Sequence, residues 1–342
     1  MDLQSANRQL AAGNNLTREQ MQDVMRLIMH GEATPAQIGA FLTALMIKGE
    51  TVEEIVGAAD IMRELAAKVD TKVERIVDTV GTGGDGARLF NVSTASALVA
   101  AAAGASMAKH GNRAATGNSG SADVLEAAGV NIAISPAQVG QCIDQVGIGF
   151  MFAPTHHAAT RHAIGPRREI GIRTVFNLLG PLTNPADAKY QLVGVFDQKW
   201  VRPIAEVFAL LGSEHTVVVC SDDGTDEISL AAGTAVAEYR NGEISTYRIE
   251  PEDFGIVKSP LDALVVEDAA HSLALIQEAL GGKQGAAFDM VALNAGATLY
   301  AADLADTIGA GVDLAREVLK SGKALDKLAQ LAALTSSFKE DS

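Results

Sequence analysis

A glycine-rich stretch, Gly81–Gly86, reads Gly-Thr-Gly-Gly-Asp-Gly and follows the short apolar run Ile76–Val80. Glycines let backbone amides approach a ligand closely, and the start of a following helix attracts anions. The stretch lacks the spacing of a dinucleotide fingerprint and the Gly-Lys-Ser/Thr of a Walker loop. Four glycines in six positions at a strand end favour an anion-binding turn. An ordinary tight turn is the alternative.

Two further segments carry groups that suit a polyanion. Asn91–Thr94 stands at the expected start of a helix, where its polar groups either cap the helix or hold phosphate oxygens or a metal. Lys109–Arg113 and the residues up to Ser121 bring two cations, amides and hydroxyls into what we expect to be a flexible loop after a strand. Lysine supplies a point charge and arginine a bidentate fork. A solvated surface loop is the alternative.

Carboxylates follow another apolar run. Asp222–Glu227 comes directly after Thr216–Cys220, and adjacent carboxylates at a strand end suit Mg²⁺, which prefers oxygen ligands. An acidic turn with a purely conformational role is the alternative. His156, His157 and His162 have no i, i+4 pair and no nearby cysteine, so we expect them to be core or surface residues.

Two arginines in Pro166–Glu169 stand at what we expect to be the start of a helix that contains Arg173. Cations are disfavoured at a helix start unless they have a partner. Either an anionic ligand or an ion pair with Glu169 or another carboxylate would satisfy them.

The elements that must position these segments are of two kinds. Residues 1–70 carry helical patterns only, with cap signals at Thr17, Thr34 and Thr51, and predict a small helical bundle. Its exposed apolar stripes would pack against a second copy of the chain. From about residue 73, short strands alternate with helices, which predicts an α/β fold with a mostly parallel sheet. The strands are expected near Ile76–Val80, Met107–Ala108, Gly149–Ala153, Gln191–Phe196 and Thr216–Cys220, with a hairpin at Asn241-Gly242.

Composition narrows the class of protein. The 342 residues carry 27 Lys and Arg against 42 Asp and Glu, a net charge of −15, which opposes nucleic-acid binding. The sequence has no apolar run of about 18 residues, so no membrane span is expected. Its opening residues lack a basic start and an apolar core, which argues against a signal peptide. Cys142 and Cys220 lie far apart, so a reduced, cytoplasmic compartment is expected. The loops would meet at the carboxyl ends of the strands and bind a phosphorylated ligand, with two phosphates, beside magnesium.

At these loops the sequence resembles the anthranilate phosphoribosyltransferase family. The family patterns occur in order as GTGGD at Gly81–Asp85, NxST at Asn91–Thr94, KHGNR at Lys109–Arg113 and SGSAD at Ser119–Asp123, followed by Pro166–Glu169, Thr174–Pro185 and Asp226-Glu227. The resemblance covers essentially the whole chain, and several long motifs in the right order are highly specific.

The resemblance implies a small all-helical N-terminal domain, residues 1–70, and a larger α/β domain, residues 73–342, that binds 5-phosphoribosyl 1-diphosphate. Helices near residues 165–185 would join the helical domain, through which two chains would form a homodimer. The implied reaction joins anthranilate to the phosphoribosyl group, with Mg²⁺, and gives N-(5-phosphoribosyl)anthranilate and pyrophosphate in tryptophan biosynthesis.

The same resemblance assigns site residues. The phosphoribosyl diphosphate would bind at Gly81, Gly84, Asp85, Asn91, Val92, Ser93, Thr94, Lys109, His110, Gly111, Asn112, Arg113, Thr116, Gly117 and Ser121. Anthranilate would contact Gly81, Asn112 and Arg167, with His110 and His157 lining its channel, and magnesium would be held by Ser93, Asp226 and Glu227. Lys109, Asn112 and Arg167 would matter most, through positioning and charge stabilisation rather than acid–base catalysis.

Several positions depart from the family pattern. Leu89 replaces a frequent threonine, Arg88 replaces a small polar residue, and Thr116-Gly117 replaces a pair of serines. These changes predict weaker binding of the sugar phosphate rather than loss of activity. A pyrimidine-nucleoside phosphorylase and a non-enzymatic relative that binds nucleic acid are the alternatives.

Overall fold

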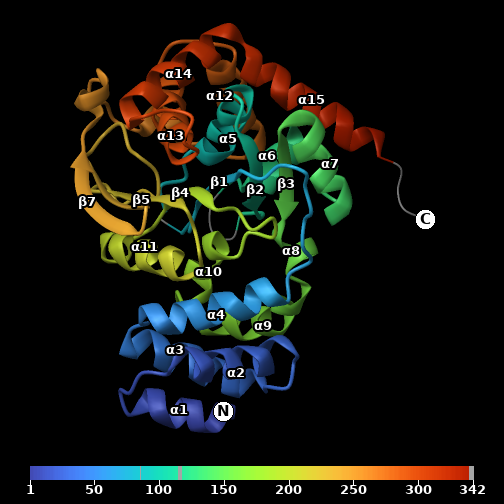
Figure 1. The fold of residues 1–342 in the computed structure, drawn as a ribbon, viewed down its shortest axis with the longest axis vertical. Coiled ribbons are helices and arrows are strands. Elements are labelled where there is room, and N and C mark those ends of the chain that lie inside the picture. The colour runs from blue at the N-terminus through green and yellow to red at the C-terminus, as the bar shows by residue number, and fades with distance from the viewer. Residues whose placement is uncertain (85, 115–117, 339–342) are drawn as a thin grey trace.

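The computed structural model describes residues 1–84, 86–114 and 118–338. Within this part of the chain, seven strands form one sheet in the order β3-β2-β1-β4-β5-β6-β7 (Figure 1). The strands are β1 (Ile76–Gly81), β2 (Ser106–Gly111), β3 (Ile148–Phe152), β4 (Tyr190–Gly194), β5 (His215–Ser221), β6 (Thr234–Arg240) and β7 (Glu243–Ile249). All pairs from β3 to β5 are parallel, and β6 and β7 extend the sheet in antiparallel fashion. The predicted α/β fold with a mostly parallel sheet is confirmed.

Four helices precede the sheet and stack below it in Figure 1. They are α1 (Leu3–Ala11), α2 (Arg18–Met29), α3 (Pro35–Lys48) and α4 (Val52–Glu64). Thr17, Thr34 and Thr51 each accept a hydrogen bond from the third helical amide and close a capping box, as their spacing predicts. Glu54 is fully buried and bound by Lys48, which fixes the turn between α3 and α4.

Three later helices pack on this bundle: α9 (Arg161–Ile170), α10 (Phe176–Leu182) and α11 (Val201–Leu210). α9 packs on α2 and α3, whereas α10 and α11 contact both α4 and the sheet. Their apolar side chains, among them Phe176 and Phe208, share one buried core with the bundle and with one sheet face. The bundle is therefore continuous with the sheet through apolar packing.

The opposite face of the sheet is covered by a second core and a helical layer, which also extends past the β3 edge. This layer comprises α5 (Val92–Ala102), α6 (Ser121–Ala127), α7 (Pro136–Val146), α12 (Ala269–Leu280), α13 (Ala286–Ala301), α14 (Ile308–Ser321) and α15 (Lys323–Ser337). The short helix α8 (Ala153–His156) follows β3. α13 packs against α5 and α14, where Gly296 and Gly311 touch without side chains between them.

Two local predictions were wrong. β2 continues through Lys109 and His110, which the sequence places in a flexible loop, because residues 107–111 pair with residues 148–152 of β3. Arg167 and Arg168 lie in the last turn of α9, not at a helix start, and Arg173 lies beyond the helix, which ends at Gly171 in the left-handed conformation. Cations are favourable at a helix end, so the dipole argument for an anionic partner does not hold there.

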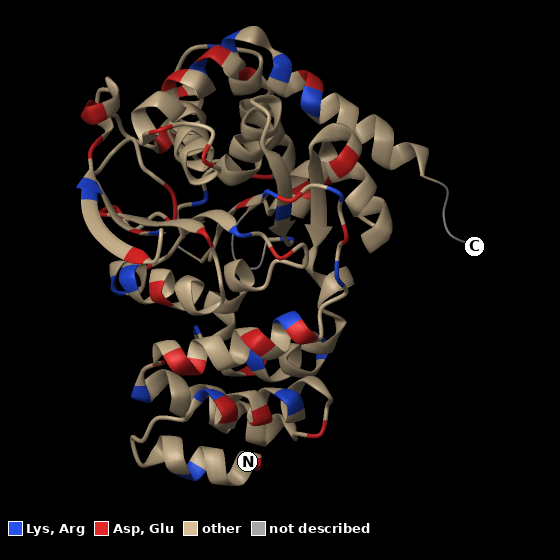
Figure 2. Cartoon of the chain, viewed as in Figure 1, with Lys and Arg blue, Asp and Glu red and all other residues tan. Residues whose placement is uncertain are grey.

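The predicted hairpin at Asn241-Gly242 is confirmed. Asn241 and Gly242 both have positive φ, 53° and 83°, and close the β6–β7 hairpin. Cys142 and Cys220 are buried free thiols. Figure 2 shows acidic and basic residues interspersed over both layers, and pairs such as Arg18–Asp60 join α2 to α4. Among the described helices, none is long and apolar enough to span a membrane.

Candidate active site

The glycine-rich loop leaves β1 and is fixed by neighbouring strands. The Thr82 amide donates to the Gly194 carbonyl at 3.0 Å, and the Gly83 amide donates to Asp226 Oδ2 at 2.6 Å. A side chain at Gly81 would place its Cβ 2.3 Å from the same Asp226 oxygen, so only glycine fits. The Arg173 guanidinium donates to the Gly84 carbonyl. Asp85 lies outside the described residues.

Lys109 projects from β2 into the space between this loop and α5. Its side chain is buried, and its Nζ donates to the Thr79 carbonyl at 2.8 Å and to Ser93 Oγ at 3.3 Å. Burial lowers the pKa of Lys109, while the negative charges of Asp78, Glu227 and Asp226 act in the opposite direction. The structure therefore brings a buried cation, a hydroxyl and two carboxylates together at the carboxyl ends of β1, β2 and β5.

The oxygen donors at this place fit a magnesium ion. Mg²⁺ is usually bound by one or two carboxylates together with substrate phosphates, rather than by a cage of protein ligands. No three His, Cys, Asp or Glu side chains of the described residues form a metal-binding group, so Ser93, Asp226 and Glu227 would need such outside ligands. Asp222 instead pairs with Arg248, and Asp223 accepts from Ser229, so neither is a candidate.

The start of α5 is organised by Asn91. Asn91 does not cap the helix through its side chain; its Oδ1 accepts from Ser119 Oγ at 2.7 Å and from Ser272 Oγ at 2.8 Å. Its amide group donates to the Ser119 carbonyl. Val92 and Thr94 are buried, and Thr94 Oγ1 has no partner among the described residues. Asn91 thus secures the neighbouring loop, and the hydroxyl near Lys109 is that of Ser93.

The loop from Gly111 to Ser121 leads from β2 to α6. Asn112 is exposed, and its carbonyl accepts from the Ser121 hydroxyl at 3.3 Å. The exposed Arg113 pairs with Asp123 and Glu126 of α6, which raises the pKa of Arg113. The Arg113 guanidinium group is therefore directed toward the carboxylates of α6. Thr116 and Gly117 lie outside the described residues.

A second group of candidate residues gathers around α10. His110 Nδ1 lies 3.1 Å from the Gly180 carbonyl, and its ring is 5.1 Å from that of His157. Burial lowers the pKa of His110 to about 3 and that of His157 to about 4, so both rings are neutral at pH 7. The Arg167 guanidinium lies 4.8 Å from the centre of the Phe176 ring, and burial lowers the pKa of Arg167.

These contacts place Arg167 and His110 against opposite ends of the same short helix, because Phe176 and Gly180 both belong to α10. Both histidine Nε2 atoms are buried without a partner among the described residues. Such atoms can meet a ligand that donates or accepts one hydrogen bond. Two neutral imidazoles and one cation grouped around α10 are side chains that suit a flat organic anion.

Sequence reasoning missed Asp78 and gave Asn184 no role. Asp78 is fully buried in β1, and its Oδ2 accepts from Asn184 Nδ2 at 2.7 Å. Burial raises the pKa of Asp78 to about 6. The available signal was a lone carboxylate within the apolar strand Ile76–Val80, which costs free energy unless it is bonded.

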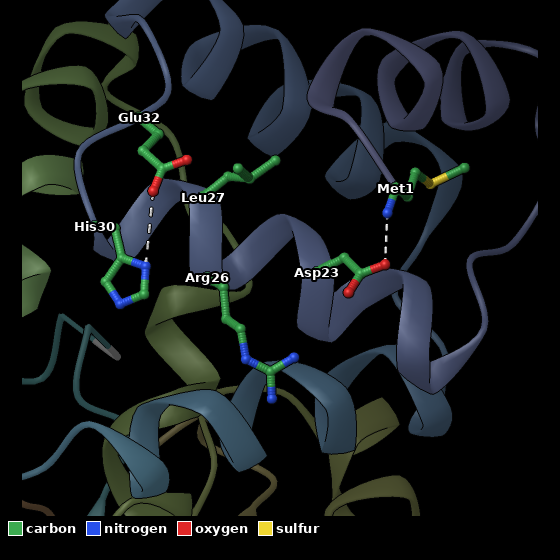
Figure 3. A pocket seen from close by; sticks show the side chains of 6 residues that line it. All are labelled: Met1, Asp23, Arg26, Leu27, His30 and Glu32. Atoms are coloured by element: carbon green, nitrogen blue, oxygen red, sulfur yellow. Dashed lines mark hydrogen bonds and ion pairs between the residues drawn. The ribbon is translucent and has the colours of Figure 1, made fainter.

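A surface hollow of about 260 Å³ lies elsewhere, on the bundle, and Figure 3 shows its lining side chains. It is lined by Met1, Asp23, Arg26, Leu27, His30 and Glu32. Several of these groups already pair: the Met1 amino group with Asp23, and Arg26 with Glu64 of α4. The hollow contains none of the residues gathered around Lys109.

Comparison with known proteins agrees with this arrangement. Residues 4–66 match the model of the glycosyl transferase family helical bundle domain, and residues 73–325 match that of the glycosyl transferase family a/b domain. An anthranilate phosphoribosyltransferase of Ectopseudomonas mendocina is 56% identical, with 100% of this chain and 99% of the relative covered. One of Thioalkalivibrio sulfidiphilus is also 56% identical, with 98% and 100% covered.

The chain belongs to the anthranilate phosphoribosyltransferase family. The Thermus thermophilus anthranilate phosphoribosyltransferase has a TM-score of 0.91 at 42% identity, covering 97% of this chain and 99% of that one. The Saccharomyces cerevisiae anthranilate phosphoribosyltransferase, solved in complex with PRPP and Mg, has a TM-score of 0.90 at 28% identity, with 98% of each chain covered. These anthranilate phosphoribosyltransferases favour the transferase over the phosphorylase and nucleic-acid alternatives.

Proposed function

We propose that the protein transfers the 5-phosphoribosyl group of 5-phosphoribosyl 1-diphosphate to the amino group of anthranilate and releases pyrophosphate, as a step of tryptophan biosynthesis. The observation that carries this proposal is the buried Lys109 ammonium beside Ser93, Asp226 and the glycine-rich loop. A buried cation next to a glycine-rich loop is suited to a departing diphosphate. Family membership supports the same reaction.

The reaction needs no strong base. Anthranilate offers a neutral aromatic amine, so the barrier lies in breaking the bond between the sugar and the diphosphate. Lys109, at the edge of the glycine-rich loop, would stabilise the negative charge that develops on the leaving group. Magnesium, held by Ser93, Asp226 and Glu227, would supply further neutralisation of the diphosphate.

Residues around α10 would bind the second substrate. Arg167 would pair with the anthranilate carboxylate, and Asn112 would orient the amine toward the sugar. The neutral His110 and His157 would line the pocket without adding charge. The Saccharomyces cerevisiae relative has been solved in complex with 4-fluoroanthranilate, which supports an aromatic acid as the second substrate.

The organisation of the chain follows the same proposal. Residues 1–70 together with α9 and α10 would form one domain, and the remainder of residues 73–342 would form the phosphoribosyl diphosphate-binding domain. Two chains would associate through the helical bundle, where Ile47 of α3 leaves 75% of its surface exposed. A cytoplasmic location stays a prediction from the sequence.

The direct test is a fluorescence assay. Purified protein is mixed with anthranilate, 5-phosphoribosyl 1-diphosphate and Mg²⁺, and loss of anthranilate fluorescence is followed. We expect a loss that requires all three components, with pyrophosphate released in equal amount. Unchanged anthranilate fluorescence in the presence of intact 5-phosphoribosyl 1-diphosphate would contradict the proposal. Nucleosides with inorganic phosphate would then be tested as substrates.

A further inference from the structure

The backbone ladder between β1 and β2 stops well before the two strands end. It pairs Ile76 with Ser106 and Val77 with Met107, whereas β1 continues to Gly81 and β2 to Gly111. Each strand remains paired with its other neighbour, β4 or β3, over five positions up to its end. The strands β1 and β2 therefore part at their carboxyl ends, where the candidate site lies.

Side chains replace the ladder bonds that this parting removes. Buried backbone amides and carbonyls need partners. The Thr79 carbonyl accepts from Lys109 Nζ at 2.8 Å, and the His110 amide donates to Asp78 Oδ1 at 3.3 Å. At Thr79 the lysine ammonium of β2 takes the place that a backbone amide of β2 would hold in a continuous ladder. The parting of the strands is therefore what places the lysine ammonium.

Asn184 completes the arrangement from the loop after α10. Its Nδ2 donates both to Asp78 Oδ2 at 2.7 Å and to the Ala108 carbonyl at 2.8 Å, which is a β2 group beside the parting. Its Oδ1 accepts from the Ala186 amide at 2.9 Å, so its orientation is fixed. Asp78 and Asn184 are 0% and 1% exposed. Together they occupy the space between the strands with a fully bonded polar pair.

We propose that Asp78 and Asn184 are a positioning pair that holds β1 and β2 apart and so directs Lys109 to the diphosphate. Neither residue touches a substrate in this proposal; both act through Lys109 and the backbone of β2. The proposal rests on the proposed function, because it is the diphosphate that Lys109 binds there. A buried carboxylate in an apolar strand is costly unless it is bonded, and here Asn184 and the His110 amide bond it.

The test uses two variants of the full chain and one matched control. Asp78→Asn keeps the size of the side chain but replaces one acceptor oxygen with an NH2 group, which then faces either Asn184 Nδ2 or the His110 amide. Asn184→Ala removes both hydrogen bonds that Nδ2 donates. Glu238→Gln is the control, because Glu238 is a buried carboxylate that binds His215, Tyr247 and Tyr300 at the opposite ends of the strands. Magnesium pyrophosphate is the calorimetric probe, and anthranilate affinity is measured on the same samples.

We expect both variants to bind magnesium pyrophosphate about 10-fold more weakly, with anthranilate affinity changed less than about twofold. Glu238→Gln should lower the melting temperature without changing pyrophosphate affinity. Pyrophosphate affinity that is unchanged in both variants, or an equal loss for both ligands, would overturn the proposal. Should Asp78→Asn fail to fold, Asn184→Ala alone carries the comparison.

The outcome separates this inference from the proposed function. A wild-type protein that binds magnesium pyrophosphate but does not consume anthranilate would contradict the transferase, while the variants would still report on Lys109. A wild-type protein that consumes anthranilate but does not bind magnesium pyrophosphate would overturn this inference alone, because Lys109 would then hold no diphosphate.

Discussion

The Asp226 carboxylate accepts a hydrogen bond from the Gly83 amide at 2.6 Å, which ties the segment after β5 to the loop after β1. The same oxygen would lie 2.3 Å from a Cβ at position 81. One contact therefore positions both the glycine-rich loop and the candidate metal ligand Asp226. A substitution in the loop or at Asp226 is expected to displace the other.

Gly81→Ala should disrupt this contact. The added methyl group must displace Asp226 or the loop, so the amides that face the diphosphate move, and we expect kcat/KM to fall about 100-fold or more. Steady-state kinetics at saturating Mg²⁺ measure this. Gly309→Ala, in α14 where the nearest atom is an ordinary 3.8 Å away, is the matched control and should keep full activity. Equal activity of both variants would refute the close approach.

Asp226→Asn should weaken magnesium use. Loss of one negative charge beside Ser93 and Lys109 should raise the Mg²⁺ concentration needed for half-maximal activity about 10-fold or more. Asp222→Asn is the control in the same acidic segment, since Asp222 pairs with Arg248 at the surface. Magnesium titrations of the three proteins test this, and parallel shifts in both variants would count against a specific role for Asp226.

Arg167→Ala should affect anthranilate far more than the sugar substrate. A charge-assisted hydrogen bond to a carboxylate contributes about 1.5–3 kcal/mol, so KM for anthranilate should rise about 10- to 100-fold. KM for 5-phosphoribosyl 1-diphosphate should stay within about twofold. Arg168→Ala is the control, because Arg168 is the exposed neighbour on α9. An equal rise of both KM values would remove Arg167 from the anthranilate site.

Stability should fall as the pH drops below 6.5. The folded-state pKa values of His110 and His157, about 3 and about 4, lie below the unfolded value of about 6.5, so protons bind the unfolded state preferentially. Their contribution is complete above pH 6.5 and is lost as the pH falls. Asp78, with its pKa raised to about 6, acts oppositely: it stabilises below about pH 4 and loses this effect as the pH rises through 6.

The two histidines outweigh the carboxylate. From these three groups alone we expect the free energy of unfolding to drop by about 2 kcal/mol between pH 6.5 and 5. Burial also lowers the pKa of His156, which adds to the drop in the same direction. Urea unfolding at the two pH values measures this drop. His157→Gln should reduce it, whereas His271→Gln, at an exposed position of α12, should leave it unchanged. A drop of the same size in all three proteins would place its origin elsewhere.

If two chains associate through the helical bundle, a substitution on the bundle surface should lower the molecular mass of the protein in solution from that of a dimer to that of a monomer. Ile47→Asp should shift the protein to monomers in analytical ultracentrifugation, since a buried charge at an interface is costly. Val257→Asp is the control, because Val257 is 84% exposed and lies far from the bundle in the sequence. A dimer that survives Ile47→Asp, or a wild-type monomer, would contradict association through α3.

The sequence could predict the helices and strands well where local rules apply. The helix starts at Thr17, Thr34 and Thr51 can be predicted because a capping box involves only residues that are close in the sequence. The end of β2 could not be read in this way. Lys109 and His110 look like loop residues, and only pairing with β3 and burial under α5 and α10 keep them in a strand.

Site prediction had the same limit. The motifs gave the residues of the glycine-rich loop, Ser93 and Lys109, but the role of Asn91 depends on Ser119 and Ser272, which come from distant parts of the chain. The ion pairs of Arg113 likewise need the geometry of α6. Partners across large sequence separations follow from the fold, not from a motif.

The apolar core shared by the bundle, α11 and one sheet face constrains how these segments of the chain can evolve. Phe41, Ile55 and Phe208 belong to one cluster of buried side chains. If residues 1–66 were encoded by a separate gene, α11 would expose its apolar surface to water until the separate bundle bound to it. Exposed apolar surfaces of this kind promote aggregation. Mutations on either side of this core must therefore be tolerated by the other side, so the two segments are expected to be inherited and to diverge together.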